Sequence, residues 1–405
     1  HRLSGSESLE RAIDWIIERM GAEGLESVRG EPVMVPKWVR GHERAELRVP
    51  RHQELPMLGL GGSVGTPPGG IEAEVLVVSS FEELGSRAAL ARDRVVLFDV
   101  PFTNYGQTVA YRARGANEAA RVGAVAVLIR SVGPFGMRTP HTGAMAAYDS
   151  AVRRIPAAAI TAEDAAMLRR MQGRGQRIVV RLEMDAHQLP DVPSRNLMGE
   201  IVGREKPDEV VVLGGHIDSW DVGTGAIDDA GGVVAAWEAV RLLHRLGLRP
   251  RRTIRAVGWT NEENGLRGGQ AYRDAHRDEL ERHVVAIESD GGTFKLRGFG
   301  FTGSDSAYAM VRQVARLLKP LGADTVLRGG GGADIGPIMA LGVPGMSHLV
   351  DGTRYFWYHH TPADNVDKVD PRELAENVAA LAVMAYVLAD LPDALPRGGA
   401  VIRDY

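Results

Sequence analysis

Short apolar runs, each followed at once by acidic or histidine residues, recur along the second half of this 405-residue chain. Runs of this length that alternate with helical stretches are typical of a mostly parallel sheet with helices on both faces. In such sheets, ligands bind beyond the carboxyl ends of the strands. The pattern therefore predicts an α/β fold whose polar clusters gather at one sheet edge. The runs and the residues that follow them are Val210–Leu213 before His216, Thr253–Thr260 before Glu262-Glu263, and Val284–Ile287 before Glu288 and Asp290.

Between the first two runs, Gly231–Leu246 has the apolar spacing of a helix. Val233, Trp237, Val240 and Leu243 would face the sheet. Asp228 and Asp229 precede this helix, where its dipole favours carboxylates. Asp229 is either the N-cap or a metal ligand. We expect Asp228 to be a ligand, because the neighbouring glycines allow close backbone approach to an ion.

The side chains in these clusters suit a metal ion. Imidazole nitrogens and carboxylate oxygens are ligands of zinc. The set also holds one carboxylate more than the metals need, and a spare carboxylate beside a metal-bound water is a general base. The clusters therefore predict a metal-dependent hydrolase.

Taken together, the motifs resemble those of metallopeptidase family 28, the co-catalytic di-zinc exopeptidases. The resemblance covers essentially the whole chain and includes Arg2-Leu3-Ser4-Gly5-Ser6 near the start. It implies the zinc exopeptidase fold and a peptide substrate. The motifs are His216-Ile-Asp218, Gly225-Ala-Ile-Asp228-Asp229, Glu262-Glu263, Asp290 and His360-Thr361.

The resemblance also implies a role for each motif residue. Two zinc ions are expected per chain, with Asp228 bridging them and a bridging water as the nucleophile. His216 and Asp290 would complete the ligands of one ion, and Glu263 and His360 those of the other. Glu262 would be the general base, while Asp218 would hydrogen-bond His216 and fix its tautomer. Family members hold the peptide after the bridging Asp in the cis form, so a cis Asp228–Asp229 bond is expected.

Substrate contacts are less constrained than metal ligands. Some relatives carry Tyr immediately before the last ligand, whereas this chain has His359, which is one candidate for contact with substrate. Asp334 follows the loop Gly329–Gly332 and is another candidate. Arg354 could bind a substrate carboxylate, but a surface salt bridge explains it equally well. The aromatic run Tyr355–Tyr358 suits core packing or a homodimer contact better than a substrate contact.

Residues 40–182 differ from the rest because they hold strand-like runs without the metal-type clusters. We expect them to form a smaller, protease-associated insert in a discontinuous peptidase domain of residues 1–39 and 183–405. The insert would be either a passive lid or a wall of the substrate pocket. Strands are expected at 71–78, 94–100, 124–129 and 157–160, and a helix is expected to begin at Gly115.

Composition narrows the function. A net charge of −4 provides no electrostatic footprint for nucleic acid. No apolar run approaches the roughly 20 residues that span a bilayer. There are 0 cysteines, which is compatible with any compartment. By resemblance we expect a secreted or periplasmic protein whose export signal is absent from this sequence.

Alternative functions are an aminopeptidase acting on longer peptides, a single-zinc acyltransferase resembling glutaminyl cyclases, and a non-enzymatic receptor-like scaffold. The filled set of ligand positions argues against the scaffold. His244, His276 and His283 lie among charged residues and are expected to be solvated.

Overall fold

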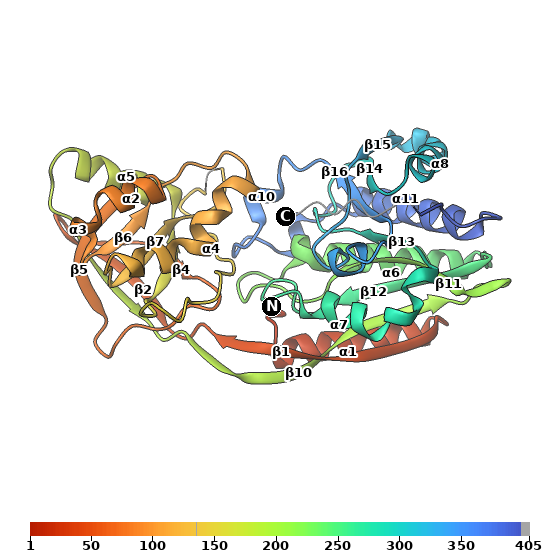
Figure 1. Ribbon diagram of the computed structural model, residues 1–405, viewed down its shortest axis with the longest axis horizontal. Helices are drawn as coiled ribbons and strands as arrows, with labels where there is room; N and C mark the ends of the chain where they lie inside the picture. Colours follow the sequence, from red (N-terminus) through yellow and green to blue (C-terminus); the bar gives the residue numbers. More distant parts are fainter. Residues whose placement is uncertain (135, 398–405) are drawn as a thin grey trace. The chain divides into compact units, whose positions relative to one another are not determined.

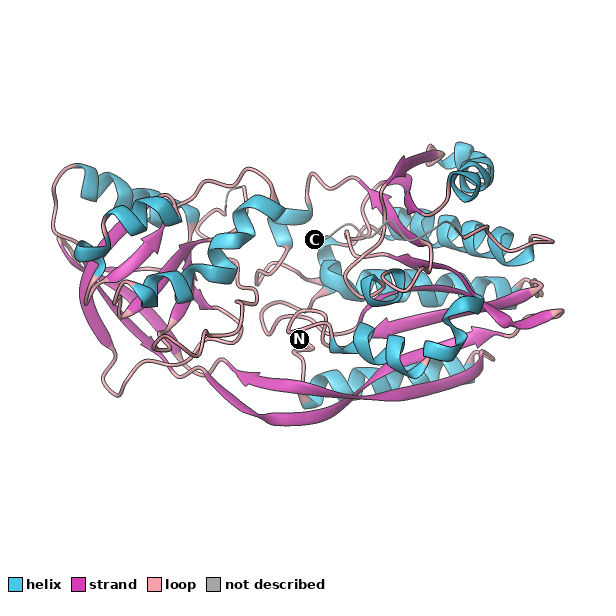
Figure 2. Ribbon diagram, in the orientation of Figure 1, coloured by secondary structure: helices cyan, strands magenta, loops and turns pink. Residues whose placement is uncertain are grey.

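The computed structural model describes residues 1–134 and 136–397, which form two compact units. Unit 1 comprises residues 1–35, 191–355 and 363–397, and unit 2 comprises Pro36–Pro190 and Phe356–Pro362. Each unit is built around its own sheet (Figures 1 and 2). The predicted insert, residues 40–182, lies within unit 2, which extends further at both ends.

The sheet of unit 1 is mixed, with strand order β1-β10-β12-β11-β13-β16-β14-β15. Its centre, β12-β11-β13-β16, is parallel, and β10 and β14 run antiparallel to their neighbours β12 and β16. This agrees with the predicted mostly parallel α/β fold. The strands are β1 (Glu26–Val39), β10 (His187–Ile201), β11 (Lys206–His216), β12 (Arg252–Trp259), β13 (His283–Glu288), β14 (Leu296–Thr302), β15 (Thr325–Arg328) and β16 (Gly345–Val350).

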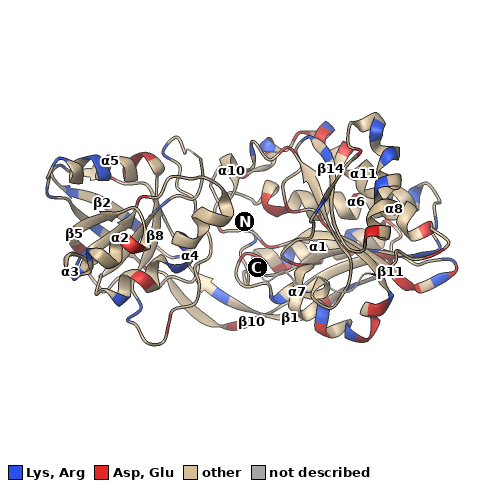
Figure 3. Cartoon of the chain, turned by 45° about the horizontal axis from the view of Figure 1, so that its top comes forward, with Lys and Arg blue, Asp and Glu red and all other residues tan. Residues whose placement is uncertain are grey.

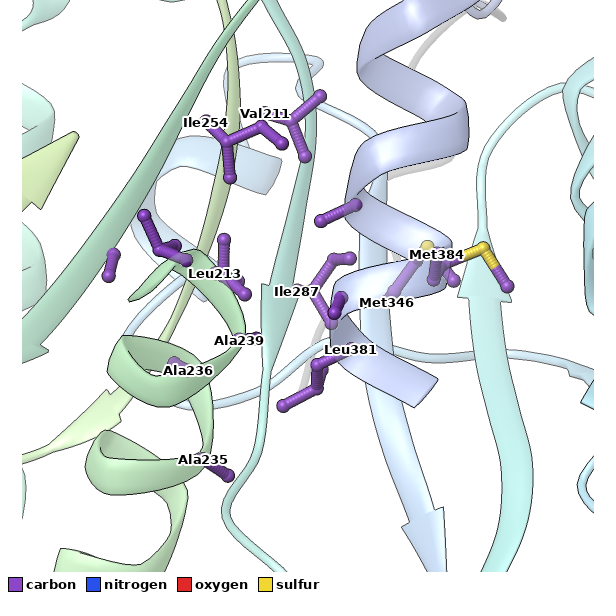
Figure 4. Packing of buried hydrophobic residues seen from close by; sticks show 14 of the residues in the cluster. Val211, Leu213, Ala235, Ala236, Ala239, Ile254, Ile287, Met346, Leu381 and Met384 are labelled. Atoms are coloured by element: carbon purple, nitrogen blue, oxygen red, sulfur yellow. The ribbon is translucent and has the colours of Figure 1, made fainter. Parts of the chain in front are cut away.

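Helices pack on both faces of this sheet because alternate strand residues point to opposite sides. Val211 and Leu213 join a large core with α6 and α11, shown in Figure 4. Val212 and Trp259 join a second core with α7 and α9. The helices are α1 (Glu7–Ala22), α6 (Gly231–Arg245), α7 (Arg267–Ala275), α8 (Asp305–Ala315), α9 (Gly336–Met339) and α11 (Pro371–Asp390), with short helical turns at Ala226–Ala230, Arg277–Arg282, Arg316–Leu321 and Val366–Lys368.

Helix α6 closely matches its predicted span. The four predicted sheet-facing residues, from Val233 to Leu243, are all buried. Because this helix packs against β11 and α11, its first turn is fixed beside the end of β11. The core thereby sets the position of the acidic residues that precede the helix.

Unit 2 has a second eight-stranded sheet in the order β3-β2-β9-β5-β6-β7-β8-β4, with β5 to β8 parallel. The four predicted strands are present as β5 to β8, within two residues at each end. The predicted helix start at Gly115 is wrong, because α4 begins at Tyr105, where Asn104 caps it. The elements are β2 (Glu43–Val49), β3 (Gln53–Glu54), β4 (Met57–Gly59), β5 (Ile71–Val78), β6 (Val95–Phe98), β7 (Ala126–Arg130), β8 (Ala157–Ile160), β9 (Val179–Met184), α2 (Phe81–Ser86), α3 (Ala88–Ala91), α4 (Tyr105–Arg121) and α5 (Ala162–Gly173); α10 (Tyr355–Tyr358) crosses from unit 1 into unit 2.

The prediction that His276 and His283 are solvated is wrong, because both side chains are buried. His276 Nε2 lies 2.9 Å from a carboxylate oxygen of Glu31, a residue distant in sequence. His283 Nε2 lies 2.9 Å from the hydroxyl of Tyr272. Tertiary contacts therefore supply hydrogen-bond partners for these two imidazoles. The charged residues next to them in the sequence did not indicate these partners.

Basic and acidic residues are interspersed over the elements of each unit (Figure 3). This distribution fits the small net charge. Within residues 1–134 and 136–397, no helix has the length and apolar character needed to cross a membrane.

Candidate metal centre

The predicted polar clusters meet at the carboxyl end of the parallel strands. His216 ends β11 and pairs with Trp259, the last residue of β12; Glu288 ends β13 beside Gly214. Because these strands are parallel neighbours, the segments that follow them begin at one edge of the sheet. The strand register therefore brings together residues that are more than 70 positions apart in the chain.

Three of the predicted ligands form a compact group. Donor atoms of His216, Asp228 and Asp290 all lie within 4.8 Å of one another. His216 Nε2 is 3.1 Å from Asp228 Oδ1 and 3.5 Å from Asp290 Oδ1. One imidazole nitrogen with two carboxylates is a donor set that suits zinc.

The imidazole of His216 is held in a defined orientation from behind. Its Nδ1 lies 3.1 Å from the backbone carbonyl oxygen of Asp218, which can only accept a hydrogen bond. The proton therefore resides on Nδ1, and Nε2 points toward the carboxylates as a ligand would. The Asp218 carboxylate is further away, at 3.7 Å, so the predicted side-chain bond is made by the main chain instead.

The Asp218 carboxylate has a different role. Its two oxygens accept hydrogen bonds from the backbone N–H groups of Glu262 (3.0 Å) and Glu263 (3.3 Å). Asp218 thus connects the loop after β11 with the loop after β12. Its carboxylate fixes the main chain from which the predicted base and one predicted ligand project.

The turn that presents Asp228 is held by an acidic residue that the sequence did not reveal. Asp364 accepts hydrogen bonds from the backbone N–H groups of Ile227 (2.7 Å) and Asp228 (3.1 Å). The Asp228–Asp229 peptide bond is cis, so that prediction is confirmed. In the sequence, Asp364 was recognisable only as an acidic residue four positions after His360.

Asp229 acts as a helix cap. Its carboxylate accepts from the N–H of Gly232 in the first turn of α6, at 3.1 Å, and from the N–H of His216, also at 3.1 Å. A Cβ on Gly215 would lie only 2.1 Å from Asp229 Oδ2, so this strand position accommodates only glycine. Of the two predicted roles for Asp229, the geometry supports capping.

The site concentrates negative charge. Burial raises the pKa of Glu262 well above its ordinary value, and the neighbouring carboxylates of Asp290 and Glu263 raise it further against the opposing effect of His216. Burial and Asp290 raise the pKa of Glu288 to about 7. Burial lowers the pKa of His216, but the surrounding carboxylates outweigh this and raise it. A bound cation would offset the repulsion between these buried carboxylates, so the residues fit a metal centre.

The three predicted substrate contacts differ in their surroundings. Asp334 is buried, and burial together with Glu288 raises the pKa of its carboxyl group well above the ordinary value. Arg354 pairs with Glu373 at 2.7 Å and lies over the ring of Phe294, so its alternative role as a salt-bridge residue is realised. A role in substrate binding for Arg354 stays a prediction.

The segment with His359 and His360 has its own contacts within unit 2. The N–H of Thr142 donates to the backbone carbonyl of His360 at 3.0 Å. His360 Nδ1 lies 3.1 Å from the carbonyl oxygen of Thr142 and 3.4 Å from Nη1 of Arg112. The ring of His359 stacks on that of His360 at 3.5 Å between centroids. The main chain of Thr142 and the ring of His359 thus hold the imidazole of His360 in place.

Core packing or a dimer contact stays a prediction for the run Tyr355–Tyr358, of which Tyr355 interacts electrostatically with acidic residues of unit 1. The pKa of its phenol is raised by burial and by the carboxylates of Asp228 and Asp290. This aromatic residue therefore lies close to the acidic group of unit 1, which the run of aromatic residues alone did not indicate.

A mostly parallel α/β sheet with buried His and carboxylate donors at its carboxyl edge defines a metal-dependent hydrolase. Residues 196–385 match the model of peptidase family M28. The chain is 48% identical to carboxypeptidase Q of Mus musculus, over 98% of this chain and 84% of that protein. A solved structure described as a peptidase M28 precursor from Shewanella amazonensis has a TM-score of 0.94 and 39% identity, covering 98% of this chain and 92% of its own.

This chain therefore belongs to peptidase family M28, as the motifs predicted. The predicted class of enzyme, a zinc-dependent exopeptidase acting on peptides, is likewise confirmed. A zinc aminopeptidase of Bacillus subtilis has the same fold, with a TM-score of 0.70 at 20% identity over 98% of this chain and 94% of its own.

Proposed function

We propose that this exopeptidase hydrolyses dipeptides or short peptides with two zinc ions. Asp228 would bridge the ions, with His216 and Asp290 on one ion and Glu263 and His360 on the other. The observation that carries the proposal is the group formed by His216, Asp228 and Asp290. The resemblance of the motifs supports the remaining two ligands.

In this proposal, zinc, Glu262 and Asp218 have separate catalytic roles. Bound zinc would polarise the scissile carbonyl and lower the pKa of a water molecule. Glu262 would take the proton from the attacking water and return it to the leaving amine, a role that commonly contributes roughly 10²–10⁴-fold. Asp218 would keep Glu262 in place through its backbone.

Substrate recognition is proposed at two further residues. His359 and Asp334 would contact the peptide near the scissile bond. His359 directly precedes the proposed ligand His360 in the sequence. The buried carboxyl group of Asp334 interacts electrostatically with Glu288. Individual His359→Ala and Asp334→Asn variants should raise KM more than they lower kcat. A pure fall in kcat at unchanged KM would contradict a role in binding.

The terminus that is recognised can be determined directly. The relative of Mus musculus is named a carboxypeptidase, which supports recognition of a free carboxylate here. Free dipeptides, N-blocked dipeptides and C-amidated dipeptides should be assayed side by side. We expect C-amidation to abolish hydrolysis; loss only on N-blocking would favour the alternative, an aminopeptidase acting on longer peptides.

The metal count separates the proposal from the single-zinc alternative. Elemental analysis of purified protein should give about two zinc ions per chain, as expected for a co-catalytic site. One ion per chain, together with cyclisation of N-terminal glutamine substrates, would favour the acyltransferase. A chain that binds no metal would favour the receptor-like scaffold.

Export and self-association are proposed as well. The similar structure from Shewanella amazonensis is described as a precursor, which supports a secreted or periplasmic protein. Fractionation of cells that express the full gene should place the activity outside the cytoplasm. A homodimer is also proposed, and light scattering on the purified protein should give twice the mass of one chain.

A further inference from the structure

Arg2, near the start of the chain, lies against the loop that follows β11. Its guanidinium donates three hydrogen bonds to backbone carbonyl oxygens: Nε to Ile217 (2.6 Å), Nη1 to Thr224 (2.6 Å) and Nη2 to Gly225 (2.9 Å). The backbone of Arg2 adds two bonds to Ser219, one to its hydroxyl oxygen (2.9 Å) and one from its N–H (3.0 Å). One residue therefore makes five hydrogen bonds to a single loop.

These bonds join the two ends of the loop. Ile217 directly follows His216, and Gly225 lies three positions before Asp228. The planar fork of a guanidinium can bond several carbonyl groups at fixed angles, which the single ammonium of lysine cannot do. Gly225 has a φ of +62°, and a Cβ there would lie 2.3 Å from Ser219, so the loop is compact where Arg2 binds it.

The charge of Arg2 is also placed among the acidic residues. Burial lowers the pKa of Arg2, and Asp218, Asp364, Asp229 and Asp228 oppose this effect. An arginine remains cationic under all conditions in which a protein is folded. It therefore relieves part of the repulsion between these carboxylates whether or not a metal is bound.

The segment around Arg2 is anchored at its other end. Ser4, two residues later, accepts a hydrogen bond from Asn261 Nδ2 at 2.8 Å, and Asn261 immediately precedes Glu262. Ser6 then caps α1, whose residues Leu9 and Ile13 are fully buried in the core. The segment thus links a core helix to both loops of the candidate metal centre.

We propose that Arg2 is a positioning residue of the metal centre, whose guanidinium ties together the two ends of the 217–225 loop. By fixing this loop, Arg2 sets the spacing between His216, which directly precedes the loop, and Asp228, which lies three positions after its end. The inference rests on the proposed metal roles of those two residues. It concerns residues that neither the motifs nor the family resemblance assigned to the site.

The test compares Arg2→Met, Arg2→Lys and Arg11→Met. Arg11 is a matched control because it lies on the exposed side of α1, with 72% of its side chain accessible. Zinc affinity is measured by competition with a chromophoric chelator. Removing a positive charge alone would strengthen the binding of a cation, whereas losing the tether would weaken it. We expect Arg2→Met to weaken zinc binding about 10–100-fold, the usual effect of losing a group behind the ligands.

Arg2→Lys retains the charge but not the fork, so it should recover only part of the affinity, while Arg11→Met should equal the wild type. Wild-type or tighter binding in Arg2→Met would overturn the inference. Full recovery in Arg2→Lys would also overturn it, because the bonds of the guanidinium fork to three carbonyl groups would then not be needed.

A second measurement needs neither zinc nor activity. Hydrogen exchange of the metal-free protein should be faster at residues 224–230 in Arg2→Met, because the loop has lost its closure. Unchanged exchange would overturn the inference. Should Arg2→Met fail to fold, Ser4→Ala should still speed exchange at residues 260–263 and weaken zinc binding; no change in either would contradict the anchoring of this segment. Wild-type protein that binds no zinc would instead refute the proposed function.

Discussion

At the scale of single residues, Glu262 and Glu263 are adjacent carboxylates in different positions. Glu263 is buried, whereas Glu262 retains some exposed surface although its carboxyl group is surrounded by protein. Both main-chain N–H groups are fixed by Asp218. Both residues lie in the turn 262–265, where the N–H of Gly265 donates to the backbone carbonyl of Glu262 at 3.3 Å.

Replacing Glu262 with Gln should leave the two proposed metals bound and lower kcat at least about a hundredfold, because the proposed general base is lost. Glu263→Gln is the matched variant, and it should lose metal. Turnover and bound zinc are measured on the same samples. Metal loss in Glu262→Gln, with full activity after zinc is restored, would show that the two roles are exchanged.

Asp228 and His216 should differ in the number of metals that depend on them. Asp228→Ala should remove both ions, because only this residue is proposed to bridge them, while His216→Ala should chiefly weaken one. Zinc per chain after dialysis against a weak chelator distinguishes the two. Equal loss of a single ion in both variants would argue against a bridging carboxylate.

At the scale of elements, the beginning of β13 carries a buried histidine that makes stability depend on pH. Burial lowers the pKa of His283 to about 4, against an ordinary value of 6.5. The unfolded chain therefore takes up this proton first as the pH falls. The stability contributed by the neutral imidazole is complete above pH 6.5 and is lost between pH 6.5 and 4.

His283→Gln should therefore reduce the loss of stability between pH 7 and 4.5, by up to about 3 kcal/mol for a shift of this size. Urea unfolding at both pH values measures the difference. His42→Gln is the control, since His42 is exposed. A pH dependence equal to that of the wild type in His283→Gln would show that this imidazole is not kept neutral by burial.

The elements also explain why distant loops act as one site. Three parallel strands end together, and hydrogen bonds from Asp218, Asp364 and Arg2 then connect the loops beyond them. Because these bonds run from side chains to the main chain, they depend on how loops meet in space. Their donors and acceptors follow no spacing in the sequence.

At the scale of the whole molecule, the acidic residues of the candidate metal centre should make stability depend on zinc. Removal of zinc leaves buried carboxylates facing one another, so the metal-free protein should unfold at a lower temperature. Free zinc at 100 times its Kd should restore about 2.7 kcal/mol of unfolding free energy for each zinc site. Calorimetry before chelation, after it and after zinc addition tests this expectation. An unchanged Tm after verified metal removal would contradict it.

The two compact units give this experiment a second readout. Unit 1 holds His216, Asp228, Glu263 and Asp290, so a calorimetric transition assigned to it should shift on chelation. Hydrogen exchange in the strands of unit 2, such as β5 and β6, serves as the internal comparison and should change less.

The sequence by itself determined the sheet, its helices and the class of chemistry. Alternating apolar runs fix which residues are buried, and polar residues placed directly after parallel strands must lie at one edge, so local pattern suffices for both. Only the tertiary structure decided that Asp218 binds the backbone of the Glu262 loop, that Asp364 and Arg2 hold the turns around Asp228, and that His276 and His283 are buried. Those outcomes depend on contacts between segments far apart in the chain, and a side chain in such a contact leaves no periodic signal in the sequence around it.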